Sequence, residues 1–126
     1  MPSRPVTAAE ADQFAREWIA AWNSHDLERI LSHYAEDVVF TSPFIVAIVG
    51  REDATVRGHE ALRDYFTRGL GVYPDLHFVH HETLAGAASV AVRYTSVGGR
   101  EAVEVMELDG DGLVCCVTAH YTEPSV

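Results

Sequence analysis

Lysine is absent from this chain of 126 residues, and all nine of its basic residues are arginine. Without lysine, no side chain can form a Schiff base with a carbonyl substrate or with pyridoxal phosphate, and none can hold a nucleoside triphosphate as a P-loop lysine does. Nineteen acidic residues outnumber the singly scattered arginines and give a formal net charge of -10. Because this charge repels phosphate backbones and anionic headgroups, we expect neither a nucleic acid nor a membrane as partner.

Cysteine and long apolar runs are also scarce. The two cysteines, Cys115 and Cys116, are adjacent. Neighbours on a strand point to opposite faces, which suits neither a disulfide nor a zinc pair, so we expect two buried small hydrophobic side chains. No apolar run approaches the roughly 18 residues of a membrane span, and residues 1–5 lack the apolar core of a signal peptide. We therefore expect a cytoplasmic protein.

The composition that remains is typical of one folded domain over residues 1–126. Hydrophobic residues make up 48% of the chain and charged residues 22%. A chain of this length buries most of its unfolded surface around a single core and is too short to divide into two.

Three segments have the periodicity of amphipathic helices. The first, about residues 7–22, opens with a capping box formed by Thr7 and Glu10. The second, residues 27–34, has apolar residues at helical spacing after a break at residues 23–26. The third begins at Gly58 and runs to about residue 70, where glycines favour a helix end.

The rest of the chain is typical of strands. Residues 38–41 are β-branched and aromatic, and a strand there would stop at Ser42 and Pro43. Residues 44–50 are apolar but bracketed by proline and by charge, so we expect an irregular or extended loop packed against a pocket mouth. Four further strands are predicted at residues 76–84, 89–97, 100–108 and 113–122. The predicted fold class is α+β, a curved, mostly antiparallel sheet over three N-terminal helices.

Glu104 stands out within the strand at 100–108. Alternation places it on one face with Ala102, Met106 and Leu108, so a carboxyl group lies among apolar neighbours. If that face meets the helices, desolvation raises the pKa of Glu104 and makes it a usable acid or base near neutral pH. The alternative is that the face of Val103 is buried and that Glu104 is simply in solvent.

Short turn and cap motifs, spread over nearly the whole chain, carry a family resemblance. They lie at residues 22–26, 34–40, 42–43, 57–62 and 73–76. Together they resemble the SnoaL-like branch of the nuclear transport factor 2-like superfamily, which includes ketosteroid isomerases, polyketide cyclases, dehydratases and non-catalytic binding domains. The resemblance implies a cone-shaped, cystatin-like α+β fold around an apolar pocket, and a homodimer formed through the outer face of the sheet.

The pattern of ketosteroid isomerases can be laid onto this chain. The resemblance puts Ser42 where that enzyme has its base carboxylate, and a serine cannot carry the proton. Trp18 falls on the oxyanion-hole tyrosine and Phe66 on a second tyrosine, while Tyr34 keeps its identity. The oxyanion-hole carboxylic acid falls on Glu104. The steroid reaction as that family runs it is therefore doubtful here.

An apolar ligand site around Glu104 is the functional prediction. The partner would be a small lipophilic molecule whose carbonyl or hydroxyl group reaches Glu104, and the acidic surface would disfavour anions. For any single aromatic residue, ordinary core packing is the competing interpretation. The predicted lining residues are Trp18, Trp22, Tyr34, Phe40, Ser42, Phe66, Met106, Val117 and Tyr121.

Seven histidines raise the question of a metal ion. His77 and His81 would share one strand face about 13 Å apart, from a rise of roughly 3.3 Å per residue, which is too far for one ion. No carboxylate follows at a metal-ligand spacing, so we predict no metal site and no cofactor. His120 is expected on the face opposite Glu104, where a dimer interface would lie.

Two functions remain open. The chain could be a cofactor-free enzyme, an isomerase, cyclase or dehydratase, in which Glu104 moves a proton with help from Trp18, Ser42 or Tyr34. It could instead be a dimeric binding or accessory module without chemistry. The second case predicts a salt bridge from Glu104 to Arg93 or Arg100, or a pocket filled by its own side chains.

Overall fold

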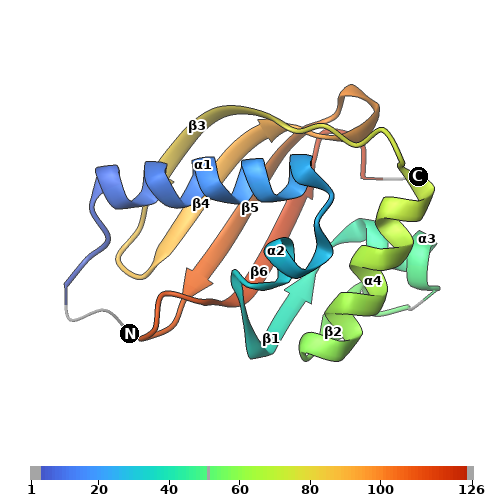
Figure 1. Ribbon diagram of the computed structural model, residues 1–126, viewed down its shortest axis with the longest axis horizontal. Coiled ribbons are helices and arrows are strands. Elements are labelled where there is room, and N and C mark those ends of the chain that lie inside the picture. The colour runs from blue at the N-terminus through green and yellow to red at the C-terminus, as the bar shows by residue number, and fades with distance from the viewer. Residues whose placement is uncertain (1–3, 51, 125–126) are drawn as a thin grey trace.

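A six-stranded curved sheet and four α-helices make up residues 4–50 and 52–124, the part of the chain that the computed structural model describes (Figure 1). The elements follow in the order α1 (Ala8–Ser24), α2 (Leu27–Leu31), β1 (Tyr34–Thr41), α3 (Pro43–Val49), β2 (Thr55–Arg57), α4 (His59–Val72), β3 (Val79–Ala85), β4 (Ser89–Thr95), η1 (Val97–Gly99), β5 (Glu101–Leu108) and β6 (Val114–Tyr121). The predicted α+β class is confirmed.

The sheet has the strand order β2-β1-β6-β5-β4-β3. The last four strands form the predicted antiparallel meander, and β1 adds to its far edge in parallel with β6. A sheet that is antiparallel apart from this one pair can bury one face and leave the other to solvent. The centre of the sheet, where β5 lies, therefore has one side directed at the helices.

Helices α1 and α4 cover that side (Figure 1). Helix α1 crosses β3 and β4, whereas α4 packs on β1 and β2. The core lies between the helices and the sheet, and Trp18 of α1 and Phe66 of α4 are both almost wholly buried in it. Of the helices in the described residues, none is long and apolar enough to cross a membrane.

The predicted capping box of α1 is confirmed. The Thr7 hydroxyl accepts a hydrogen bond from the Glu10 amide at 3.1 Å, and the Glu10 carboxylate accepts one from the Thr7 amide at 3.0 Å. Two of the free amides at the helix start are thereby satisfied. The helix continues two residues beyond the predicted end at 22 and stops at His25 in a left-handed conformation, with φ 60°.

The predicted second helix is too long, because Tyr34 lies in β1 and not in a helix. The Ser32 hydroxyl donates to the Arg29 carbonyl at 2.6 Å, close to the end of α2. The His33 carbonyl instead accepts from the amide of Val114 at 2.8 Å. This hydrogen bond joins the chain to β6 directly after the one and a half turns of α2. Tyr34 then pairs with Val114 at the start of β1.

The predicted loop at residues 44–50 is wrong, because residues 43–49 form helix α3. Ser42 is the N-cap, with its hydroxyl accepting from the Phe44 amide at 3.3 Å, and Pro43 occupies the first turn. Gly50 ends the helix with φ 79°. Serine, proline and glycine at these positions are start and stop signals of a helix, and the proline is a break only for the preceding strand.

Two further differences concern strand limits. The short strand β2 was not predicted; its three residues pair antiparallel with the end of β1. The strand predicted at 76–84 begins only at Val79, because Leu76 and Phe78 leave the sheet and pack into the core.

Strand β6 carries the two cysteines and, on the outer face of the sheet, His120. The cysteines are half-buried free thiols, so the prediction of two buried side chains is wrong. The β5–β6 register shifts between Glu107 and Leu108, opposite the cysteines, which opens the ladder there. His120 is exposed and pairs with Val103, on the face opposite Glu104 as expected. The homodimer implied for this face stays a prediction.

The helical assignment of residues 43–49 makes a prediction about two adjacent positions. Ile45 is fully buried, whereas Val46 is 47% exposed. Ile45→Ala should lower the free energy of unfolding by about 2–5 kcal/mol, because it leaves a cavity under α3. Val46→Ala should change it by less than about 0.5 kcal/mol. Urea unfolding of both variants checks this, and equal effects at the two positions would contradict a helix with one buried face.

Candidate functional site

Glu104 lies at the middle of β5 with its side chain directed at the helices. It pairs with Val92 of β4 on one side and Ala119 of β6 on the other. Its neighbours Ala102 and Met106 on the same face are buried, and Glu104 itself is only 3% exposed. The alternation predicted from sequence is therefore confirmed, and the interpretation that leaves Glu104 in solvent is wrong.

The two oxygen atoms of this carboxyl group have different surroundings. The Tyr94 hydroxyl donates a short hydrogen bond to Oε2. Oε1 is buried and has no hydrogen-bond partner among the described residues. A buried carboxyl oxygen without a partner is costly, so the free Oε1 is the point at which a ligand would be stabilised most.

Neither of the salt bridges considered for Glu104 forms. The Arg93 guanidinium lies 3.5 Å from the Glu82 carboxylate at the surface. Arg100 donates to the main-chain carbonyls of Val97 and Glu123 at 3.1 and 3.0 Å. Among the residues that the structure describes, no cation therefore compensates the buried carboxyl group, and this unusual condition sets its acidity.

Burial raises the pKa of Glu104 from its ordinary 4.5 to about 7, and the hydrogen bond from Tyr94 acts in the opposite direction. At neutral pH both the protonated and the ionised forms are populated. A group in this state can take up or release a proton at little cost, which is the property required of a general acid or base.

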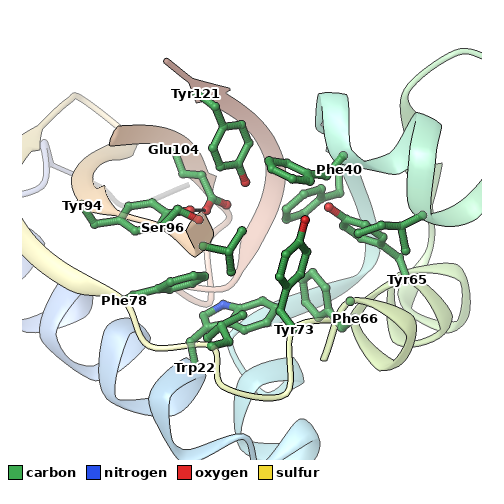
Figure 2. A pocket seen from close by; sticks show the side chains of 15 residues that line it. Trp22, Phe40, Tyr65, Phe66, Tyr73, Phe78, Tyr94, Ser96, Glu104 and Tyr121 are labelled. Carbon is green, nitrogen blue, oxygen red and sulfur yellow. Dashed lines mark hydrogen bonds between the residues drawn. The ribbon is translucent and has the colours of Figure 1, made fainter. Parts of the chain in front are cut away.

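The Glu104 carboxyl group forms part of the wall of an apolar pocket (Figure 2). The pocket lies between the sheet, the α3 and α4 helices and the segment that leads into β3. The cavity volume is about 60 Å³. Its lining is mainly aromatic and consists of Trp22, Phe40, Phe44, Ile48, Tyr65, Phe66, Gly69, Tyr73, Leu76, Phe78, Tyr94, Ser96, Val97, Glu104 and Tyr121.

Four of the predicted lining residues surround this pocket together with Glu104. They are Trp22, Phe40, Phe66 and Tyr121. Phe66 makes edge contacts with Trp22 and Phe40, at ring centroid distances of 4.7 and 5.5 Å. The rings that line the pocket therefore pack against one another.

The other five predicted residues lie behind the pocket wall. The Trp18 indole donates to the Tyr34 hydroxyl at 3.0 Å, so each satisfies the other inside the core. The Ser42 hydroxyl caps α3. Met106 and Val117 are fully buried core residues.

Tyr94, which donates the hydrogen bond to Glu104, is not among the site residues predicted from the sequence. It is fully buried and pairs with Ala102, two residues from Glu104 on the adjacent strand. The alternation of Val90, Val92 and Tyr94, combined with the glycine turn at 98–99, places the tyrosine diagonally opposite Glu104. The pairing of Tyr94 with Ala102 could have been derived from the sequence of the hairpin that joins β4 and β5.

Two other tyrosines of the pocket, Tyr65 and Tyr121, stay protonated. Burial raises the pKa of Tyr65 and of Tyr121 above the ordinary value, and the charge of Glu104 adds to both rises. A hydrogen bond with Ser42 acts in the opposite direction at each of them. These hydroxyls can donate hydrogen bonds to a ligand, but they cannot act as bases near neutral pH.

The two histidines of β3 each lie close to a polar or charged side chain. His80 lies 2.6 Å from the Thr83 hydroxyl, and His81 lies 3.6 Å from the Glu101 carboxylate. Within residues 4–50 and 52–124, no three His, Cys, Asp or Glu side chains are grouped closely enough to hold a metal ion.

Comparison with known proteins supports the resemblance carried by the turn and cap motifs. A family model described as a SnoaL-like domain matches residues 15–122. A SnoaL-like protein of unknown function from Burkholderia thailandensis E264 has a similar solved structure, with 47% sequence identity and a TM-score of 0.90. The match covers 94% of this chain and 99% of that one. No curated protein matches the chain.

Two more distant structures share the fold but carry names of different activities. A candidate ketosteroid isomerase from Kribbella flavida DSM 17836 is 24% identical, with a TM-score of 0.66 over 92% of this chain and 80% of that one. AclR, a candidate hydroxylase from Streptomyces galilaeus, is also 24% identical, with a TM-score of 0.70 over 94% and 93%. The fold alone therefore does not fix a reaction.

The hydrogen bond from Tyr94 predicts a change in the acidity of Glu104. Tyr94→Phe removes the donor that favours the ionised form, so the pKa of Glu104 should rise above about 7. Difference infrared spectroscopy of the protonated carboxyl band, followed against pH, measures the midpoint. Tyr73→Phe, at a lining residue without a hydrogen bond to Glu104, is the matched control. A midpoint that Tyr94→Phe lowers or leaves unchanged would contradict the assignment.

The raised pKa of Glu104 also predicts how stability depends on pH. Between pH 4.5 and about 7 the folded protein keeps a proton on Glu104 that the unfolded chain releases. This contribution to stability is complete below pH 4.5 and is lost as the pH rises to about 7, by at most about 3 kcal/mol.

Glu104→Gln has no proton to lose and should not show this decline. The free energy of unfolding of the variant, relative to wild type, should therefore increase between pH 5 and pH 8 in urea titrations. Glu107→Gln, at an exposed position on the same strand, should give a constant difference. A constant difference for Glu104→Gln as well would show that Glu104 titrates normally.

Proposed function

The chain belongs to the SnoaL-like domain family, and from that premise we propose that it is an enzyme that moves a proton on a small apolar carbonyl compound, with Glu104 as general acid and base. The observation that carries the proposal is the carboxyl group itself. It is 3% exposed, it has no cationic partner among the described residues, and its Oε1 is unpaired where the side chain lines a pocket.

The chemistry follows from the two forms of Glu104. In the ionised form, Oε1 can remove a proton from the carbon next to a carbonyl group. In the protonated form, it can return the proton to another carbon or donate a hydrogen bond to the developing enolate oxygen. Isomerisation, aldol-type cyclisation and dehydration share this step, and none of them requires an electron carrier.

Other polar groups of the pocket can hold the carbonyl oxygen while Glu104 moves the proton. The Tyr121 hydroxyl stays protonated and lines the pocket on the side of Glu104 (Figure 2). The indole nitrogen of Trp22 is buried and has no hydrogen-bond partner among the described residues. Hydrogen-bond donors fixed in an apolar site stabilise negative charge strongly, because water does not compete.

Ser42 and Trp18 do not take part in this proposal. The ketosteroid isomerase pattern would give them the base and the oxyanion donor, yet Ser42 caps α3 and Trp18 donates to Tyr34. A single carboxyl group would therefore both remove and return the proton. The reaction would differ from the ketosteroid isomerase pattern in the position of that carboxyl group, because the resemblance puts Glu104 on the oxyanion-hole acid and Ser42 on the base.

A non-catalytic binding module is the second candidate, and the size of the pocket favours it. A volume of about 60 Å³ is small, because the aromatic side chains fill much of the space between sheet and helices. Cavities that bind a benzene ring are on the order of 150 Å³. Such a module would hold a small molecule at Glu104 without transferring a proton.

Deuterium exchange separates the two candidates without knowledge of the natural substrate. Wild-type protein should accelerate the incorporation of solvent deuterium next to the carbonyl group of 2-butanone at neutral pH, followed by proton NMR. Glu104→Gln should reduce this acceleration by at least about 100-fold, because the general base is lost.

Glu107→Gln, at an exposed position on the same strand, is the control and should exchange at the wild-type rate. An unchanged rate in Glu104→Gln would overturn the proposed mechanism. Binding of 2-butanone by wild type without any acceleration would favour the binding module.

A further inference from the structure

A second hollow lies directly outside the pocket of Glu104. We call this second space the outer hollow and the pocket of Glu104 the inner pocket. The two spaces share four of their lining residues, Tyr73, Leu76, Ser96 and Val97. The wall between them is therefore only one side chain thick. Tyr73 and Val97 are half-buried, so the side chains that separate the two spaces are partly in contact with solvent.

The two hollows differ greatly in size. The outer hollow is open to water-sized molecules over about 500 Å³, compared with about 60 Å³ for the inner pocket. A cavity that holds the six carbon atoms of benzene is on the order of 150 Å³, so by the same proportion the inner pocket, at about 60 Å³, takes about two to three non-hydrogen atoms. That is enough for a carbonyl group and a neighbouring carbon atom, and too little for a fused-ring steroid.

The residues that line the outer hollow suit an uncharged hydrocarbon chain of a ligand. Val72, Pro74 and Val97 contribute apolar surface, and the turn at Gly98 and Gly99 contributes main chain without side chains. Both glycines have positive φ, 67° and 73°, so the turn keeps a conformation that larger residues rarely adopt. Of the arginines in the described part of the chain, none lines the hollow, and Asp75 disfavours an anionic group.

We propose that the ligand is an elongated, uncharged aliphatic carbonyl compound, whose short head lies against Glu104 and whose hydrocarbon chain passes Tyr73 and Val97 into the outer hollow. The head and the chain then occupy two spaces that share one thin wall. This inference rests on the proposed function for the role of the head. Tyr73 and Val97 are the residues that determine how long a chain is accepted.

A homologous pair of ketones tests the second space. Isothermal titration calorimetry should show that 2-heptanone binds the wild-type protein at least about tenfold more tightly than 2-butanone. The three additional methylene groups would be buried, and each full burial is worth roughly fourfold in affinity. Equal affinities, or no binding of either ketone, would overturn the proposal.

Substitutions outside the inner pocket test where the hydrocarbon chain of the ligand lies. Val72 lines only the outer hollow and is 54% exposed, so Val72→Trp should fill that space and abolish the preference for 2-heptanone. Val79→Trp is the matched control: this valine is 47% exposed, lines neither hollow, and its substitution should preserve the preference.

His77→Trp, at a second residue that lines only the outer hollow, repeats the test if Val72→Trp does not fold by circular dichroism. If a folded Val72→Trp or His77→Trp variant still bound 2-heptanone more tightly than 2-butanone, the hydrocarbon chain of the ligand would lie outside this hollow, and the proposal would be wrong. Because these measurements report binding and not turnover, they can fail or succeed independently of deuterium exchange at Glu104.

Discussion

The cost of keeping one carboxyl group away from water determines the properties of the whole pocket. An ionised carboxylate loses several kcal/mol of hydration on burial, and only a close cation restores most of it. Glu104 has a tyrosine in place of a cation, so its proton is retained to about pH 7. Ordinary structural carboxylates are not left in this state, whereas groups that exchange protons with a substrate commonly are.

The same apolar walls that raise the pKa of Glu104 also select what can reach it. Aromatic side chains from α1, α4 and the segment before β3 exclude water from the carboxyl group and leave a narrow space beside it (Figure 2). The central position of β5 in the sheet places Glu104 at the floor of this space. The acidity of Glu104 and the proposed selectivity for small apolar molecules therefore come from one packing arrangement.

Much of this arrangement could be predicted from local patterns in the sequence. Strict alternation along β5 identified the buried face of Glu104, and the capping box identified the start of α1. Helix α3 was missed because Pro43 was interpreted as a strand end and not as a first helical residue. The lining of the pocket could be predicted only in part, since Phe78 and Tyr73 reach it from a segment outside regular strands, whose course depends on tertiary packing.

A crystal structure of the protein soaked with 2-butanone tests the central claim most directly. The account predicts the ketone in the inner pocket, with its oxygen within hydrogen-bond distance of Glu104 Oε1 and with Oε2 still bonded to Tyr94. A ketone bound elsewhere, or a Glu104 carboxyl group whose two oxygens are both paired with protein side chains, would contradict it.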